Sequence, residues 1–309
     1  MPAVASTVVV VDAAAAGERL DHFARRHWPQ LSRMALAALI ARGAVRVNGR
    51  SASKGRLLCE GDRVEAAEAD LPASAQPEAD PALPLRVLYE DKWLVVVDKA
   101  AGVPSHALRP GERATVASAL LARYPEMAGV GYRPLEPGLL HRLDTETSGI
   151  LIAARDSATF DQLRAAHARG AIDKQYLALC AGRLEPRVEH AYLNAAQRRV
   201  RVTRQPTPGA RPISSEIRQA TLLAGAWSLV QVGVAFAARH QVRAHLAALG
   251  HPIAGDALYG GPSLPGLTHH FLHASDAALK HPVSGEALQI HAELPEDLAA
   301  LVAELSVSR

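Results

Sequence analysis

The sequence predicts an α+β protein built from two folded units, and three observations support this class. Segments with apolar residues at helical spacing alternate with segments whose apolar residues recur at every second position. Of the 309 residues, 49% are hydrophobic and 21% are charged, which is typical of a globular protein. A stretch rich in proline, alanine and acidic residues interrupts this pattern. We therefore expect a small unit over residues 1–66, a linker over 67–84 and a larger unit over 85–309.

The small unit, whose core we place at residues 17–66, is predicted to contain two helices and a hairpin. Apolar residues recur at helical spacing from Leu20 to Trp28 and again from Leu36 to Ile40. Gly43 follows the second stripe, where a glycine commonly ends a helix. Asn48-Gly49 lies between two short alternating runs, which predicts a tight hairpin turn.

The small unit is basic, although the net charge of the whole chain is only +3. Between Glu18 and Glu65 there are ten basic and five acidic residues. Arginine suits phosphate because its planar group donates two parallel hydrogen bonds. We expect contacts to a polyanion from residues around the second helix and the hairpin, namely Arg25, Arg26, Arg33, Arg42, Arg46, Asn48 and Arg50. The alternative is an ordinary solvated face.

Composition also excludes several classes of protein. Cys59 and Cys180 are the only cysteines and form no CxxC pair, so we expect neither a disulfide framework nor a cysteine zinc site. The N-terminus has no basic segment typical of a signal peptide, and we expect a cytoplasmic protein. Residues 219–238 carry no charged side chain, but Val230, Val232 and Val234 alternate, which predicts a buried strand and not a membrane span.

In the larger unit, residues 139–154 predict a rigid loop held between two buried strands. Leu139-Leu140 and the run from Gly149 to Ala154 are strand-like, and Asp144 lies in the middle of the connection. An Asp in such a place is most often ordinary turn chemistry. A Ser/His/Asp hydrolase is a further alternative, but the GxSxG motif is absent and such triads are assembled from distant segments.

Several ordered motifs in this unit carry a family resemblance. The segment HRLDTETSGILI, residues 141–152, resembles the signature of the RluA-type pseudouridine synthases. The segments DKAAGVPSH, KQYLA, HQVRAHL, GHPIAGDALYG and LHA resemble further motifs of that family, in the same order. The small unit resembles an S4 RNA-binding domain, through RLD, SR, GAVRVNG and GD. The resemblance covers the chain from about residue 18 to 297 and implies a mixed, largely antiparallel sheet with flanking helices and a central cleft.

The resemblance implies that the protein isomerises uridine to pseudouridine in RNA, without cofactor, metal or ATP. Asp144 is then the catalytic carboxylate, either as nucleophile at C1′ or as the base that abstracts a sugar proton. Arg243, in the first turn of a predicted helix, would form an ion pair with it. Tyr176, on an alternating strand, would stack on the flipped base and relay the C5 proton. We expect further substrate contacts from the same motifs, at His141, Arg142, Leu143, Thr147, Gln241 and Leu272.

The resemblance also implies a substrate class and leaves alternatives open. An S4-like domain accompanies family members that act on large-subunit ribosomal RNA, so this RNA is the expected partner, with tRNA as the alternative. A second basic cluster follows a predicted strand and is interpreted as an RNA-facing hairpin, at Arg198, Arg199 and Arg201. Phe236-Ala237-Ala238 stands where the family has Thr-Gly-Arg or Thr-Gly-Lys. This departure is the one argument for a catalytically silent RNA-binding protein. A monomer is expected.

Overall fold

The computed structural model describes residues 6–28, 31, 33–67, 76–195, 199–234 and 237–307. In this part of the chain the strands form two separate sheets, one in each predicted unit. Buried apolar residues form a separate core for each sheet. Among the described residues, no helix has the length and apolarity needed to cross a bilayer.

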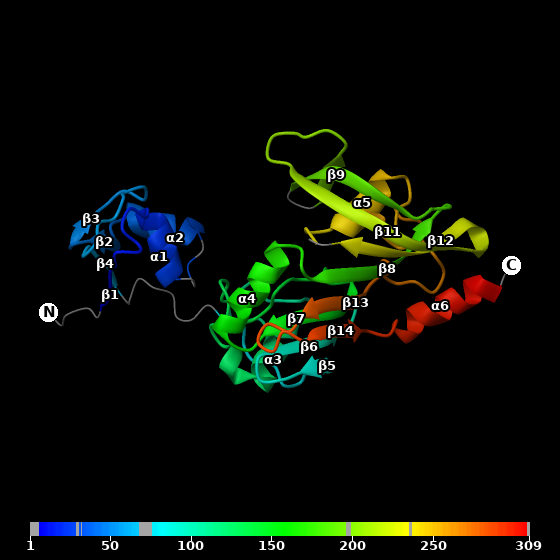
Figure 1. The fold of residues 1–309 in the computed structure, drawn as a ribbon, viewed down its shortest axis with the longest axis horizontal. Coiled ribbons are helices and arrows are strands. Elements are labelled where there is room, and N and C mark those ends of the chain that lie inside the picture. Colours follow the sequence, from blue (N-terminus) through cyan, green and yellow to red (C-terminus); the bar gives the residue numbers. More distant parts are fainter. Residues whose placement is uncertain are drawn as a thin grey trace.

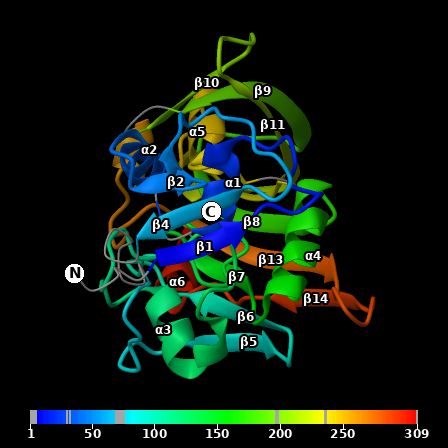
Figure 2. The same ribbon diagram turned by 90° about the vertical axis from the view of Figure 1, so that its left-hand side faces the viewer.

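The small unit packs two helices against a four-stranded antiparallel sheet. The helices are α1 (Leu20–His27) and α2 (Arg33–Ala41). The sheet order is β1-β4-β2-β3, with β1 (Ser6–Val10), β4 (Arg63–Ala67), β2 (Val45–Val47) and β3 (Arg50–Ser51). Figure 2 shows β1, β4 and β2 side by side.

The predicted helices and hairpin of this unit are confirmed. Leu20, Phe23 and Trp28 are buried on or next to α1, as are Leu36 and Ile40 on α2. Asn48 and Gly49 join β2 to β3 with φ angles of 51° and 73°, the left-handed pair that a type I′ turn requires.

The small unit begins earlier than the predicted core of residues 17–66. Strand β1 pairs with β4 over its whole length, and Val11 is buried at its end. The apolar run before Asp12 does not alternate between apolar and polar residues, so the sequence-based prediction contains no strand there.

The larger unit is built on one extended sheet, in which ten strands are described. Its order is β10-β9-β11-β12-β8-β13-β7-β6-β5, and β14 pairs with the free part of β13. Figure 1 shows β13 between β7 and β8. Among the described strands, β13 and β7 form the parallel pair and the other neighbours run antiparallel, so the predicted mixed, largely antiparallel sheet is confirmed.

The bounds of these strands follow the chain in order: β5 (Arg86–Glu90), β6 (Leu94–Lys99), β7 (Ser148–Ala154), β8 (Asp173–Ala181), β9 (Arg187–Ala195), β10 (Val200–Thr203), β11 (Arg211–Leu223), β12 (Trp227–Val234), β13 (Leu272–Lys280) and β14 (Ala287–His291). The helices are α3 (Val116–Arg123), α4 (Ser157–Ala168), α5 (Gln241–Ala248) and α6 (Glu296–Val307), with short 3-10 turns at Pro125–Met127, Ala224–Ala226 and Ala257–Tyr259. Strand β7 is buried over its whole length, as expected for the middle of a sheet covered on both faces.

Two segments differ from the sequence-based prediction. Leu139-Leu140 does not form a strand: Leu139 makes only an isolated bridge to Ala153. Pro137, two residues earlier, has no amide hydrogen with which to extend the pairing. Residues 76–84 belong to the predicted linker, yet they contact the larger unit. The Asp80 amide donates to the Ser118 carbonyl at 2.9 Å, and Glu78 forms an ion pair with Arg113. Of the linker, residues 68–75 lie outside the described part.

Candidate active site

The loop that carries Asp144 is fastened to the sheet at both ends. Before it, the Leu140 amide donates to the Ile152 carbonyl at 3.0 Å, alongside β7. After it, the Thr147 amide donates to the Asp144 carbonyl at 3.0 Å and closes a turn. In between, the Ser105 hydroxyl bonds both backbone groups of Leu143, at 2.8 and 3.0 Å. The loop is therefore a rigid platform for the Asp144 carboxylate.

Lys99 supports the same loop from the end of β6. Its side chain is 2% exposed, and its Nζ donates to the carbonyls of Ala100, Val103 and Thr145 at 2.7–2.9 Å. Thr145 is the residue after Asp144, so Lys99 ties the Gly/Pro loop after β6 to the candidate catalytic turn. Burial lowers the pKa of Lys99 to about 7, although the charges of Glu146 and Asp144 oppose this shift.

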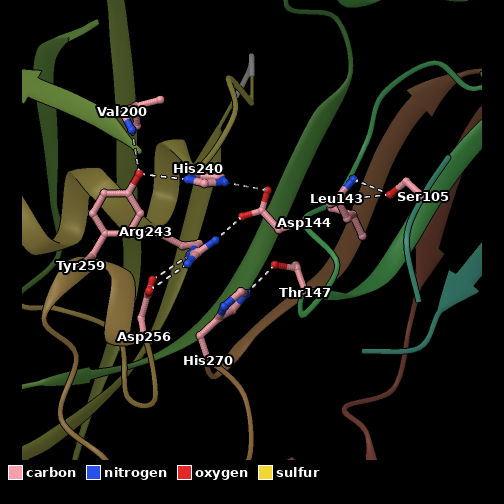
Figure 3. A network of polar contacts seen from close by, with 10 residues as sticks. All are labelled: Ser105, Leu143, Asp144, Thr147, Val200, His240, Arg243, Asp256, Tyr259 and His270. Atoms are coloured by element: carbon pink, nitrogen blue, oxygen red, sulfur yellow. Dashed lines mark hydrogen bonds and ion pairs between the residues drawn. The ribbon is translucent and has the colours of Figure 1, made fainter. Parts of the chain in front are cut away.

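Asp144 forms an ion pair with Arg243, and the pair extends to a second carboxylate (Figure 3). Nη1 of Arg243 donates to Oδ2 of Asp144 at 2.7 Å. Nε and Nη2 donate to the two oxygens of Asp256 at 2.7 and 2.8 Å, a bidentate contact that fixes the guanidinium plane. Burial lowers the pKa of Arg243, but both carboxylates outweigh it and hold the pKa above its ordinary value. Arg243 therefore stays charged beside Asp144.

His240 and Tyr259 complete this network on its other side (Figure 3). His240 precedes α5 with a φ of 55°, and its Nε2 lies 3.7 Å from Oδ1 of Asp144. The Tyr259 hydroxyl accepts the Val200 amide at 2.9 Å and lies 2.9 Å from Nδ1 of His240. Burial lowers the pKa of His240, which leaves the ring neutral near pH 7. Among the described residues, Oδ1 of Asp144 accepts no hydrogen bond, and Nε2 of His240 faces it (Figure 3).

A cleft of about 900 Å³ opens beside this network. Tyr176 of β8 and Leu272 of β13 lie in its wall, and both side chains are buried. Burial, and next the charge of Asp144, raise the pKa of Tyr176 well above its usual range, so its phenol is neutral. The cleft brings together all the residues predicted to be catalytic or to bind substrate: His141, Arg142, Leu143, Asp144, Thr147, Tyr176, Gln241, Arg243 and Leu272.

Within the cleft, several of these residues have their polar groups engaged by the protein itself. The Gln241 amide accepts from the Ala238 backbone and donates to the Ser214 carbonyl, so it fixes the start of α5. Thr147 bonds His270 at 2.8 Å. These contacts hold the walls of the cleft.

The two residues at the start of the HRLD motif differ in exposure. His141 accepts the Ile152 amide at 3.3 Å, and burial lowers its pKa far below the usual value. Arg142 is exposed and contacts Glu136 and His106. Of these two predicted substrate contacts, Arg142 therefore presents its charge to the cleft, whereas His141 supports the sheet.

The residues predicted to bind RNA lie outside the cleft, on the small unit and on one hairpin. Arg25, Arg42, Arg46 and Arg50 are exposed, and Arg26 pairs with Glu18 at 2.8 Å. Asn48 is engaged by its own unit: it donates to Asp62 and accepts the Arg63 amide, so its role there is to fix the hairpin. Arg199 and Arg201 are exposed on the predicted hairpin between β9 and β10. Arg198, Phe236 and the side chain of Arg33 lie outside the described part.

Sequence reasoning missed the residues that hold the catalytic candidates in place. Asp256 and Tyr259 lie in the segment GHPIAGDALYG, and Lys99 lies in DKAAGVPSH, but the resemblance assigned none of them a role. An aspartate in a Gly-rich segment is a sequence signal that could have indicated a partner for Arg243. Further cations of the cleft wall, including Arg133, Arg164 and Arg211, come from distant segments and had no signal in the sequence.

The described residues include no group of three or more His, Cys, Asp or Glu side chains arranged to hold a metal ion. His269, His270 and His273 are close in sequence, but they have different partners. His270 bonds Thr147, and His273 bonds Ser148 and the Ala292 carbonyl.

Comparison with known proteins places this site in a family. Residues 93–248 match the family model described as RNA pseudouridylate synthase. An RNA pseudouridine synthase of Chloroflexus aurantiacus is 35% identical over 96% of this chain and 93% of its own length. The ribosomal large subunit pseudouridine synthase D of Nitrosomonas europaea is 32% identical over 93% of this chain and 84% of its own length.

Solved structures agree in fold. Human RNA pseudouridylate synthase domain containing 4 superposes with a TM-score of 0.56 and 22% identity, over 71% of this chain and 92% of its own. Human RNA pseudouridylate synthase domain containing 1 superposes with a TM-score of 0.52 and 23% identity, over 71% of this chain and 86% of its own. Together with the family match and the relatives that align with nearly the whole chain, this shows that the protein belongs to the RNA pseudouridine synthases and is an isomerase.

Proposed function

We propose that this enzyme isomerises uridines in large-subunit ribosomal RNA, with Asp144 as its catalytic carboxylate. The single observation that carries the assignment of Asp144 is its position: a carboxylate on a rigid loop, paired with a buried arginine and open to a cleft. The ribosomal substrate is supported by relatives from Nitrosomonas europaea and Yersinia pestis that are named ribosomal large subunit pseudouridine synthase D.

The reaction rearranges one nucleotide without net gain or loss of atoms. The N1–C1′ bond of uridine breaks, the base turns, C5 bonds to C1′, and the proton on C5 leaves while N1 gains a proton. Asp144 begins this sequence, as nucleophile at C1′ or as the base that removes a sugar proton. Because Oδ2 is held by Arg243, Oδ1 is the oxygen placed to act. Arg243 itself stays charged, and its guanidinium donates to Oδ2 at 2.7 Å.

Tyr176 and the cleft around it would receive the target base. The base must leave its stack to reach Asp144, at a cost of a few kcal/mol that is smallest in loops and single strands. The ring of Tyr176 lies in the cleft wall and is neutral at physiological pH. In this proposal the ring stacks on uracil and the phenol relays the C5 proton.

The small unit is proposed to be an S4-like RNA-binding domain. Two helices against a small sheet present exposed arginines at Arg25, Arg42, Arg46 and Arg50. Such cations bind the phosphate backbone with little regard to sequence. In this interpretation the small unit holds the RNA while the cleft selects the uridine, and Arg199 and Arg201 add contacts from the β9–β10 hairpin.

The test is tritium release from large-subunit ribosomal RNA transcribed with 5-tritiated uridine. Forming the C5–C1′ bond must expel the C5 hydrogen, so released tritium measures the reaction itself. Wild type should release tritium, whereas Asp144→Asn should release none and keep its RNA affinity within a few-fold. The substitution keeps the shape of the side chain and removes the charge.

Parallel assays on tRNA distinguish the alternative substrate. Release from tRNA alone would overturn the ribosomal assignment and keep the chemistry. Binding without release from either RNA would show a silent RNA-binding protein and direct attention to residues 236–238. If Asp144→Asn lost RNA binding as well, Asp144 would be a structural residue and not the catalytic one.

A further inference from the structure

An exposed aromatic ring, distinct from the candidate catalytic residues, lines the cleft. Tyr132 is 62% exposed, although the chain has only six tyrosines and aromatic residues make up 4% of it. The ring lines the same cleft as Asp144 and Tyr176. Burying an aromatic ring is strongly favourable, so one left in solvent beside an active-site cleft indicates a surface for a ligand.

The Tyr132 ring is held in place from behind. Its edge meets the Phe160 ring at a centroid distance of 5.3 Å and an angle of 89°, and its hydroxyl bonds Asp161 of the same helix, α4. Gly131 makes this approach possible. Its φ is +94°, and a Cβ there would lie 3.1 Å from the Phe160 ring. A fixed orientation reduces the entropy lost when a flat ligand stacks on the exposed face.

Together with this ring, the cleft is lined by Arg133, Arg142 and Arg164. Arg164 is exposed one turn after Phe160 on α4 and lines the cleft, and no carboxylate among the described residues forms an ion pair with it. Arg133 and Arg142, both exposed, share Glu136 as partner. Together with Arg164, and with Asp161 at the Tyr132 hydroxyl, these five side chains keep a net charge of +1. An aromatic face beside arginines is the arrangement that binds unpaired nucleotides, through stacking and phosphate contacts.

We propose that the exposed face of Tyr132, backed by Phe160, stacks on an unpaired base that neighbours the target uridine, while Arg164 binds an adjacent phosphate. This inference rests on the proposed function, because it assumes an RNA strand in the cleft. It assigns a second nucleotide subsite on α4 and the loop before it. The cleft, at about 900 Å³, lies at the upper end of the sizes found for small-ligand pockets, roughly 300–1,000 Å³, and thus exceeds what one uracil fills.

The subsite also has a consequence for substrate choice. A stacked neighbour must itself be free of a duplex, so the enzyme would favour uridines whose flanking residue is already unpaired. Stacking tolerates any base because every base has a flat face. The subsite therefore selects RNA structure and not sequence.

The first experiment measures steady-state tritium release from the 5-tritiated large-subunit transcript. Tyr132→Ala should raise KM about 5- to 150-fold, the loss expected for one stacked base, and lower kcat much less. Tyr132→Phe keeps the ring and should stay within about twofold of wild type in KM. The matched control is Val283→Ala, an exposed apolar residue outside the cleft lining, which should change neither constant.

The second experiment maps the contact directly, by zero-length ultraviolet cross-linking of the full-length Asp144→Asn protein to the same transcript. Mass spectrometry should find a nucleotide attached to Tyr132, within residues 124–142, and the Tyr132→Phe, Asp144→Asn double variant should carry its cross-link at the same position. Cross-links confined to other segments of the cleft would overturn the proposal.

The outcomes separate this inference from the proposed function. If wild type releases no tritium, the proposed function is wrong, and the stacking subsite that rests on it is wrong as well. If wild type is active and Tyr132→Ala has the wild-type KM, the stacking subsite is wrong and the function stands. A raised KM in Tyr132→Phe as well would assign the effect to the bond with Asp161 and overturn stacking. If Tyr132→Ala changed only the sedimentation of the protein, the ring would contact another protein chain and the proposal would be wrong.

Discussion

At the scale of single residues, the site depends on one guanidinium that serves two carboxylates. Arg243 donates in a bidentate manner to Asp256 and with its third nitrogen to Asp144. Asp256 is 1% exposed, so it cannot leave this contact for water. The arrangement sets the orientation of the Asp144 carboxylate. An ammonium group carries the same charge but lacks the planar set of donors.

Arg243→Lys is expected to lower kcat by about 100-fold, the typical cost of misplacing a catalytic group by 1 Å. Lysine would keep a positive charge near Asp144 but could not bond both oxygens of Asp256 and Asp144 together. Tritium release under saturating RNA measures the change. Arg183→Lys, at a surface pair with Glu185, serves as the control. A kcat near the wild-type value in Arg243→Lys would show that charge alone suffices.

Lys99 provides a prediction about stability and pH. Its pKa falls from 10.5 to about 7 in the folded protein, so between these values the unfolded chain binds the extra proton. The contribution of Lys99 to the free energy of unfolding is then largest above pH 10.5 and decreases as the pH falls to about 7. Wild type should gain up to about 1.4 kcal/mol per pH unit relative to Lys99→Met from pH 7 to 9. Urea unfolding of both proteins at these pH values measures it, and parallel curves would contradict the shift.

At this scale, the sequence indicates which residues carry reactive or charged groups, but it does not indicate which atoms those groups contact. Asp144, Tyr176 and Arg243 carry reactive or charged groups in recognisable motifs, and the structure places all three in one cleft. Gln241 and Thr147 lie in the same motifs, but their polar groups bond the protein. A sequence pattern marks that a residue matters, yet it does not say whether its polar atoms face the substrate or the backbone.

At the scale of elements, the decisive contact is the one between β7 and β13. Gly149 lies in that parallel pair with a φ of +107°, opposite Ala274. A Cβ at Gly149 would lie 2.2 Å from the Ala274 carbonyl oxygen, which neither strand can accommodate. Because β7 begins directly after the Asp144 loop, any separation of the two strands also moves that loop.

Gly149→Ala should therefore destabilise the protein and lower its activity together. Gly209→Ala is the matched control, since Gly209 also has a positive φ of 77° but a Cβ there would have open space within 4 Å. Gly209→Ala should lower the free energy of unfolding by about 1–2 kcal/mol, the penalty of the left-handed backbone alone. Gly149→Ala should cost clearly more, as measured by thermal or urea unfolding. Equal costs would mean that the strands adjust.

The elements themselves were largely predictable, and the exceptions have physical reasons. The helices of the small unit, the strands around 94–99 and 148–154, and α5 follow their apolar periodicity. Leu139-Leu140 is strand-like by composition, but it follows Pro137 and Gly138 and runs beside β7 only as far as one bridge. Strand β1 pairs with β4, more than fifty residues later, and a pairing of that range leaves no local pattern.

At the scale of the whole molecule, both units carry arginines that could contact RNA: one set on the small unit and another in the cleft lining of the larger unit. Of the arginines in the small unit, Arg25, Arg42, Arg46 and Arg50 are exposed and none of them lines the cleft. Each unit has its own apolar core. Deleting residues 1–70 should weaken RNA binding and reduce the slope of log K against log salt by about 0.7–0.9 for each phosphate that the small unit binds. Filter binding at several salt concentrations measures the slope. An unchanged slope would remove the small unit from the RNA interface.

The order of the strands could not be predicted from the sequence. Nothing in residues 272–280 indicates that they insert between β7 and β8, which lie about a hundred residues earlier. That insertion brings Tyr176 and Asp144 to one cleft, since Ala274 pairs with Tyr176 on one side and with Gly149 on the other. The family resemblance predicted a mixed, largely antiparallel sheet, whereas the structure shows which strands are neighbours.

The late position of β13 has a consequence for how the enzyme is made. A ribosome that has released only the first 271 residues has exposed Asp144, Tyr176 and Arg243, yet the strand that joins β7 to β8 is still missing. The nascent protein thus has every candidate catalytic side chain before it has an active site. For the same reason we expect chains that terminate before residue 272 to be inactive, and the chemistry to begin only when synthesis is nearly complete.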